Sequence, residues 1–83
     1  MSDDKIQYLV LDRCNPGANM ARFYALSIEA SLFGDATLIR EWGRIGTAGQ
    51  GKIELHESKD TALEALEMWL RRKQRRGYVA RPD

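Results

Sequence analysis

The fold is indicated most clearly by one stretch, Arg40-Glu41-Trp42-Gly43-Arg44-Ile45-Gly46-Thr47-Ala48-Gly49-Gln50-Gly51, where a strand pattern gives way to a glycine-rich loop. In a regular strand, Trp42 and Arg44 project from one face and Gly43 from the other, where another chain segment could approach closely. An indole ring beside a guanidinium group suits a sugar, a base or a phosphate. The same pattern also fits a tryptophan in a thin core whose arginine pairs with Glu41 or another acid, so both interpretations stay open at this point.

The loop that follows resembles a nucleotide-binding P-loop only superficially. Residues 46–52 match the spacing G-x-x-x-x-G-K, but Ile53 stands where that motif needs Ser or Thr. The alternation over residues 52–56 predicts a strand, whereas a P-loop needs a helix whose amides hold the phosphate. Nucleotide hydrolysis is therefore not expected. The loop glycines Gly46, Gly49 and Gly51 can take positive φ and expose amides to an anion.

Outward from this stretch, alternating β-formers and turn signals predict an antiparallel sheet of about four strands. We expect the first strand to be largely covered on both faces, and Ile53 and Leu55 of the last strand to face the core. Asn15-Pro16-Gly17 marks the first turn. The expected strands cover about residues 5–13, 21–29, 36–45 and 52–57.

A long helix is predicted after the last strand. Ser58 is a good N-cap and Asp60 adds negative charge to the first turn. The helix should end near Arg76, with Gly77 as the residue after the cap. The fold class is therefore α+β, with this C-terminal helix packed on one sheet face and the other face left for a partner. The apolar stripe of the helix consists of Ala62, Leu63, Ala65, Leu66, Trp69 and Leu70.

The composition predicts one domain over residues 1–83, with its core at about 5–79. One cysteine, Cys14, and one histidine, His56, give no plausible metal site and lie on different predicted elements, so we expect no metal, no cofactor and no enzyme. The acidic N-terminus has no signal-like apolar region, and no apolar run approaches the roughly 20 residues that span a bilayer. A cytoplasmic protein without a membrane partner is expected.

The charge is distributed unevenly although the total is only +1. Residues 1–70 hold seven Lys/Arg and eleven Asp/Glu, a net charge of −4. The six basic residues of 71–82 are accompanied by no acid and form a cluster that could attract phosphate. The same residues also fit a solvated helix end whose cations suit the helix dipole. The cluster comprises Arg71, Arg72, Lys73, Arg75, Arg76 and Arg81.

Residues 42–46, followed by Gly49-Gln50, strongly resemble the signature of the WGR domain. The resemblance extends to the segments 19–24 and 58–62, and to Lys73 with Gly77-Tyr78, so that it covers about Tyr8 to Val79. WGR domains occur in DNA-damage-activated poly(ADP-ribose) polymerases and in short bacterial proteins. This chain resembles a stand-alone bacterial member that lacks the catalytic polymerase domain.

The resemblance implies where a ligand would bind. In the polymerases the module lies near a DNA break, where its tryptophan packs on the terminal nucleotide and its arginine joins DNA to neighbouring domains. By position, Trp42 is the expected stacking residue, Gly43 belongs to the signature, Arg44 is a phosphate or partner contact, and Lys73 is a backbone-phosphate contact. Charge alone adds four further candidates to the nucleic-acid-binding set: Arg71, Arg72, Arg75 and Arg76.

Two functions are compatible with these residues. The first is a non-catalytic module that binds DNA ends or nicks through phosphate and sugar, without reading bases. The second is a protein-docking module that uses the same Trp/Arg face, including possible self-association, because tryptophan and arginine also dominate protein interfaces.

Overall fold

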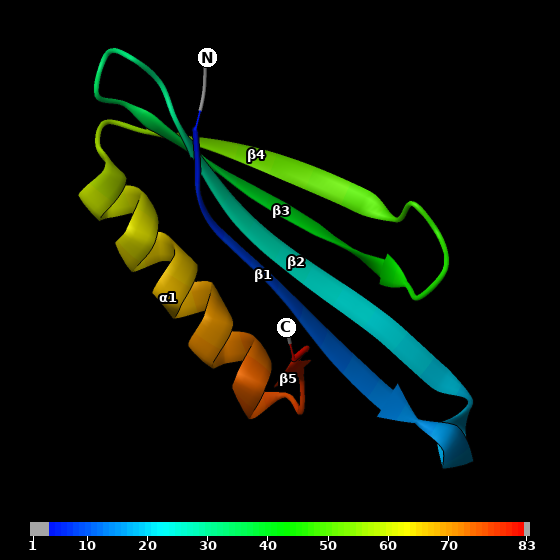
Figure 1. Cartoon of the computed structure of the whole chain (residues 1–83). Helices are drawn as coiled ribbons and strands as arrows, with labels where there is room; N and C mark the ends of the chain where they lie inside the picture. Colours follow the sequence, from blue (N-terminus) through cyan, green and yellow to red (C-terminus); the bar gives the residue numbers. More distant parts are fainter. Residues whose placement is uncertain (1–3, 83) are drawn as a thin grey trace.

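The computed structural model describes residues 4–82, with side chains described from residue 7 onward. One five-stranded antiparallel sheet has the order β4-β3-β2-β1-β5, and a single helix lies along one face (Figure 1). The α+β fold predicted from the sequence is thus confirmed. The elements are β1 (Asp4–Asn15), the 3-10 helix η1 (Pro16–Ala18), β2 (Met20–Ala30), β3 (Ala36–Arg44), β4 (Gln50–His56), α1 (Lys59–Arg75) and β5 (Val79–Ala80).

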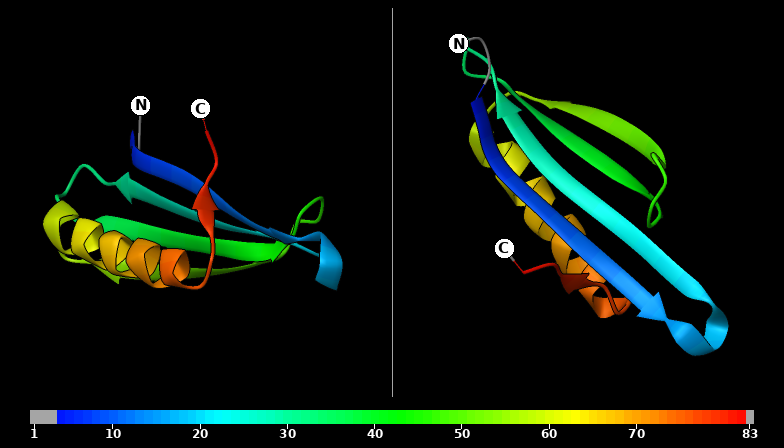
Figure 2. Two further views of the ribbon diagram at one scale, coloured as in Figure 1. Left: turned by 90° about the horizontal axis from the view of Figure 1, so that it is seen from below. Right: turned by 45° about the vertical axis from the view of Figure 1, so that its right-hand side comes forward.

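The core lies between α1 and the central strands (Figure 2). The fully buried side chains come from alternate positions of three adjacent strands, and α1 contributes Ala62 and Leu66. Burying large aliphatic side chains in this layer contributes roughly 1.5–3 kcal/mol each. The largest fully buried side chains are Leu11, Leu26, Ile28 and Leu38.

No described helix covers the opposite sheet face, and this corrects two expectations about apolar residues. The register pairs Ile39 with Ile53 and Thr37 with Leu55, so both β4 side chains project away from α1. Ile53 is 65% and Leu55 81% exposed. The prediction that they face the core was wrong because alternation shows that a strand has an apolar side, but not which side the helix covers. Likewise the face of β1 away from α1 is only partly covered, since Tyr8 is 56% exposed and Val10 is half-buried.

Both predicted helix ends are confirmed. The Ser58 side chain accepts a hydrogen bond from the Thr61 backbone amide, as an N-cap does. At the other end Gly77 has φ 97°, and the amides of Gly77 and Tyr78 donate to the carbonyls of Gln74 and Lys73. This paired hydrogen bonding is a Schellman motif, which reverses the chain and directs it back toward the sheet.

The reversal produces a short fifth strand that the sequence pattern did not predict. β5 pairs with β1 through Leu11–Ala80 and Asp12–Val79. An ion pair anchors the end of the chain, because Arg81 donates to both carboxylate oxygens of Asp12, at 2.8 and 2.6 Å. A two-residue strand on an edge therefore depends on a charged contact as well as on backbone hydrogen bonds.

This anchor should depend on pH. The hydrogen bond from Arg81 holds the pKa of Asp12 below its ordinary value of 3.8, so the contact stabilises the fold above that pH and is lost as the pH falls through the lowered pKa. Arg81→Ala should therefore lower the melting temperature at neutral pH but make no difference in strong acid. Thermal melts of both proteins from pH 7 to pH 2 measure this. A melting-temperature difference that stays constant across that range would show that the ion pair is not responsible.

Candidate nucleic-acid interface

A pocket of ≈ 510 Å³ opens at the C-terminal end of α1, between that helix end, β2, β3 and the β1–β2 connection. Four of its lining side chains are cationic and three are aromatic, and no Asp or Glu is among the described residues that line it. The lining residues are Ala18, Asn19, Met20, Ala21, Arg22, Tyr24, Arg40, Trp42, Gly43, Arg44, Lys73 and Tyr78.

Aromatic rings form the floor of this pocket. Tyr24, at the centre, stacks on Trp42 with ring centroids 6.1 Å apart and meets the edge of Tyr78 at 6.2 Å. Trp69 of α1 lies on a further side of Tyr24, at 6.4 Å. Because Trp42 also packs against the buried core, its ring is fixed in place and leaves only part of its surface to a ligand.

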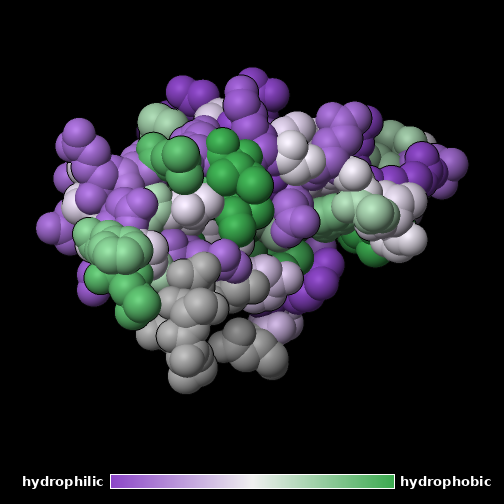
Figure 3. Space-filling view, turned by 90° about the horizontal axis from the view of Figure 1, so that it is seen from above, coloured by the Kyte–Doolittle hydropathy of each residue, from purple (hydrophilic) through white to green (hydrophobic). Residues whose placement is uncertain are grey.

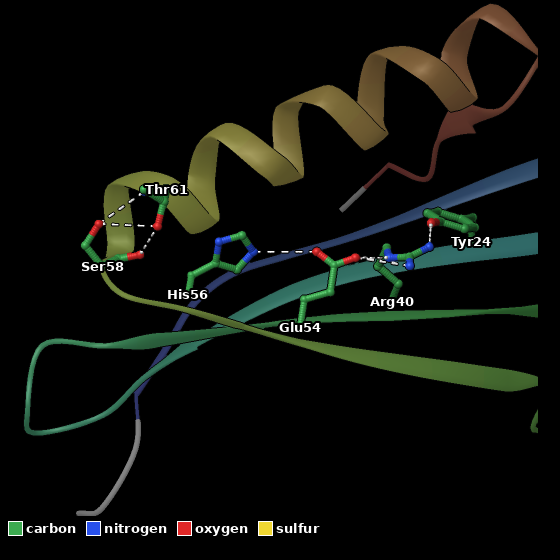
Figure 4. Close-up of polar contacts among 6 residues, drawn as sticks. All are labelled: Tyr24, Arg40, Glu54, His56, Ser58 and Thr61. Carbon is green, nitrogen blue, oxygen red and sulfur yellow. Dashed lines mark hydrogen bonds and ion pairs between the residues drawn. The ribbon is translucent and has the colours of Figure 1, made fainter.

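Arg40 is buried beneath the rings, with only 8% of its surface exposed. Its Nε and one terminal nitrogen reach Glu54 Oε2 at 3.2 and 3.1 Å, and its other terminal nitrogen donates to the Tyr24 hydroxyl at 3.1 Å (Figure 4). The guanidinium also lies 4.0 Å from the Trp69 ring centroid. On the far side of Glu54, His56 Nε2 is 3.5 Å from Oε1.

Lys73 brings a second cation over the aromatic floor. Its Nζ is 4.5 Å from the Tyr24 ring centroid and 5.7 Å from that of Tyr78. Burial lowers the pKa of this ammonium, and the positive charges of Arg76, Arg40 and Arg72 lower it further. An incoming anion would relieve that repulsion, so the electrostatics of the pocket favour a negatively charged ligand.

Arg44 and Arg22 stand at the open rim. They are direct cross-strand neighbours on β3 and β2, and both are exposed. Among the described side chains, those of residues 7–82, no ion pair to either arginine is found, and Glu41 lies on the opposite sheet face by strand parity. The predicted alternative, in which Arg44 pairs with Glu41 or another acid, is therefore not found among these side chains. Two directly opposed like charges without an acid beside them repel each other.

Gly43 and Gly49 allow the β3–β4 loop to pack closely against β3, on the sheet face opposite to the one that carries Trp42. A Cβ built on Gly43 would lie 2.7 Å from the Gly49 Cα, because the β3–β4 loop folds back against the strand there. The close approach expected at Gly43 is thus made by the chain's own loop. Gly43 contacts the pocket through its backbone, so its place in the predicted site is indirect.

The predicted site residues fall into two groups in space. The pocket brings together Trp42, Gly43, Arg44 and Lys73. The remaining helix-end arginines lie outside it: Arg71, Arg72 and Arg75 line a separate surface groove with Glu64, Glu67 and Met68, Arg72 also contacts Trp69, and Arg76 is the exposed helix C-cap.

Four charged or aromatic residues that line the pocket were missing from the predicted set: Arg22, Tyr24, Arg40 and Tyr78. The alternation of residues along β3 puts Arg40 on the same face as Trp42, so the sequence alone indicated its position. The assignment of Arg22 and Tyr24 depends on the register of β2 against β3, which makes them cross-strand neighbours of Arg44 and Trp42.

Together the fold and the pocket define a small α+β module with a cationic, aromatic binding site. The chain matches the WGR domain family over residues 8–83, and it belongs to that family. The WGR domain is a nucleic-acid-binding, non-catalytic module in poly(ADP-ribose) polymerases and related proteins.

Two further comparisons place the chain among known proteins. The uncharacterized protein y4dW of Sinorhizobium fredii (strain NBRC 101917 / NGR234) is 47% identical over 75 residues, covering 90% of this chain and 37% of y4dW. The chain thus spans little more than a third of the length of that relative. No solved structure matches it. Within residues 4–82, no helix is both long and apolar enough to cross a membrane.

Proposed function

We propose that this protein binds DNA ends or nicks through the pocket at the end of α1, by contacts to phosphate and sugar and without reading base sequence. The observation that carries the proposal is the composition of the pocket wall, whose described residues include three aromatic rings, no acid and four cations, of which only Arg40 is paired with a described acid, Glu54. A phosphodiester strand supplies the complementary chemistry, because each phosphate needs a cation and each terminal sugar or base has a flat face.

The arrangement of the pocket supports an end rather than a continuous duplex as the ligand. Trp42 is recessed between the β1–β2 connection and the helix end, so its free surface lies inside a concave site. A nucleotide within an intact duplex is stacked on both sides, whereas a terminal or nicked nucleotide has a face free to pack on the ring. Arg22 and Arg44 at the rim and Lys73 inside the pocket would neutralise the phosphates next to that nucleotide.

The outer arginines have a secondary place in this proposal. Arg71, Arg72, Arg75 and Arg76 extend the positive surface along the helix end, where they would meet the backbone farther from the break. They should raise affinity for any duplex in a salt-dependent way and add no preference for ends.

Substitution of the pocket residues tests the proposal. Trp42→Ala should weaken binding to nicked and blunt duplexes about tenfold or more, in line with roughly 1–3 kcal/mol per stacked base. Arg44→Ala should weaken binding and reduce the salt slope by about one. Fluorescence anisotropy with labelled nicked, blunt and overhanging duplexes measures both, over a series of salt concentrations.

Lys59→Ala is the matched control, because it removes one exposed positive charge at the other end of α1. It should leave affinity nearly unchanged. Since Trp42 also contacts the core, Trp42→Phe and a thermal melt of each variant separate lost binding from lost folding. The proposal fails if the native protein binds no duplex at low salt, or if Arg44→Ala and Lys59→Ala behave alike. Salt-insensitive capture of a protein at the Trp/Arg face would instead support docking.

A further inference from the structure

The outer edge of β4 is an open sheet edge. β4 is the last strand in the sheet order, and no described element pairs with its far side (Figure 2). Its seven residues pair with β3 without a register shift, and they include no proline. Such an edge presents unpaired backbone amides and carbonyls, and proteins usually protect it with bulges, prolines or charges. The other sheet edge, β5, is only two residues long.

The side chains of β4 are complementary to themselves in one antiparallel register. If two copies pair with Ile53 opposite Ile53, then Lys52 of each copy stands opposite Glu54 of the other. Directly opposed residues in an antiparallel pair share a face, so both Lys–Glu contacts form on the helix-covered face. Lys52 is exposed, and among the described residues it has no ion pair within its own chain.

The neighbouring symmetric registers are unfavourable. Centring the pair on Lys52 or on Glu54 would place two like charges directly opposite each other. Centring it on Gly51 or Leu55 would leave fewer residues of the seven-residue strand paired. The register centred on Ile53 therefore combines the longest pairing with the best charge match, and it sets Gly51 opposite Leu55, which leaves room for the larger side chain.

This pairing would remove apolar surface from water mainly on the sheet face that no described helix covers. Ile53 and Leu55 are 65% and 81% exposed, and Ile39 lies next to Ile53 on the same face. The view from above shows apolar side chains standing at the surface among hydrophilic ones (Figure 3). Pairing two β4 strands would join the apolar strips of both copies and remove part of this surface from water.

We propose that the protein forms a symmetric dimer in which the two β4 strands pair antiparallel about Ile53 and join the two sheets into one. None of the β4 residues, all of which the structure describes, lines the cationic pocket, so a dimer would carry two separate pockets. The proposal does not depend on DNA binding, and its tests use the protein without nucleic acid.

The first test is the mass of the full chain in solution. Sedimentation equilibrium at increasing concentration should show a shift from 9.5 kDa toward twice that mass. Lys52→Glu replaces both Lys–Glu contacts by Glu–Glu contacts and should raise the dissociation constant about tenfold or more. Arg76→Glu makes the same change in charge at the far end of α1 and should leave the dissociation constant unchanged. A monomer at every concentration, or equal effects of the two variants, would overturn the proposal.

The second test determines the register. Because Cys14 is exposed, the background for it is Cys14→Ser. In that background Ile53→Cys should oxidise to a disulfide-linked dimer, since position 53 opposes itself and the Cα atoms of opposed residues in an antiparallel pair are about 4.5–5.5 Å apart, a separation that a disulfide spans. Leu55→Cys is the matched control and should cross-link far more slowly, because its opposite residue is Gly51. Equal cross-linking at the two positions would rule out this register. Both positions are exposed, and a thermal melt verifies that each variant is folded.

Discussion

Replacing Gly49 by alanine should destabilise the protein by about 3 kcal/mol or more, placing it among the most damaging single substitutions. Gly49 has φ +72°, a conformation that costs an L-residue about 1–2 kcal/mol. In addition, the new Cβ would lie 2.2 Å from the Trp42 backbone oxygen and 3.0 Å from the Phe23 ring. Because the nearest atom belongs to the backbone, relief requires moving the β3–β4 loop or the strand that carries Trp42. Urea unfolding monitored by circular dichroism measures the loss.

Gly46→Ala is the control for this substitution. Gly46 lies in the same loop with φ +95°, but a Cβ there meets no atom within 4 Å. Its replacement should therefore cost only the backbone strain, about 1–2 kcal/mol. If the two variants lost equal stability, the close approach of the loop to Trp42 would not be what constrains position 49.

Removing the Glu54 carboxylate should destabilise the fold by about 2–3 kcal/mol. Glu54→Ala leaves the guanidinium of Arg40, 8% exposed, without its only described acidic partner. Breaking a buried ion pair typically costs about 3–5 kcal/mol. We expect a smaller loss of about 2–3 kcal/mol here, because the Glu54 side chain is 30% exposed and water screens the pair. Chemical unfolding gives the free energy, and Trp fluorescence should report the disturbed packing around Arg40, which lies 4.0 Å from the Trp69 ring centroid.

Two further variants separate the ion pair from a general effect of charge. Glu54→Gln keeps an oxygen that accepts from Arg40 and should recover part of the lost stability. Glu41→Ala removes an exposed acid from the neighbouring strand and should change stability by no more than about 0.5 kcal/mol. An effect of Glu54→Ala as small as that of Glu41→Ala would show that Arg40 finds water or another acceptor.

Much of the fold was predictable because its signals are local. Ser58 is an N-cap and Gly77 a positive-φ residue after the helix for reasons that involve only a few neighbouring residues. Alternation after the glycine loop predicts the strand β4, and a strand at that place is incompatible with a P-loop. β5 was not predicted as a strand because two residues carry no periodicity, and their pairing with β1 depends on where the Schellman motif directs the chain.

The candidate site was predicted only in part. Parity placed Trp42 and Arg44 on one face, and the chain's resemblance to its family indicated Lys73, so the sequence pointed to the wall of the pocket. The sequence did not show the contacts between strands. The register of β2 on β3 places Tyr24 at the centre of the aromatic floor and Arg22 beside Arg44. The basic cluster at the helix end was predicted from charge alone, and the structure separates its members. Lys73 lines the pocket, three arginines line a separate groove, and Arg81 is paired with Asp12.

Local sequence specifies which segments become strands and helix, where the helix begins and ends, and that Trp42 and Arg44 share a face, because these properties depend on residues close together in the chain. Long-range packing decides which sheet face α1 covers, and hence that Arg40 is buried while Ile53 and Leu55 are exposed. A strand's alternation defines two faces but carries no information on which one the helix will cover. That choice follows from packing the stripe of α1 around Ala62 and Leu66 against the larger buried set on β1, β2 and β3.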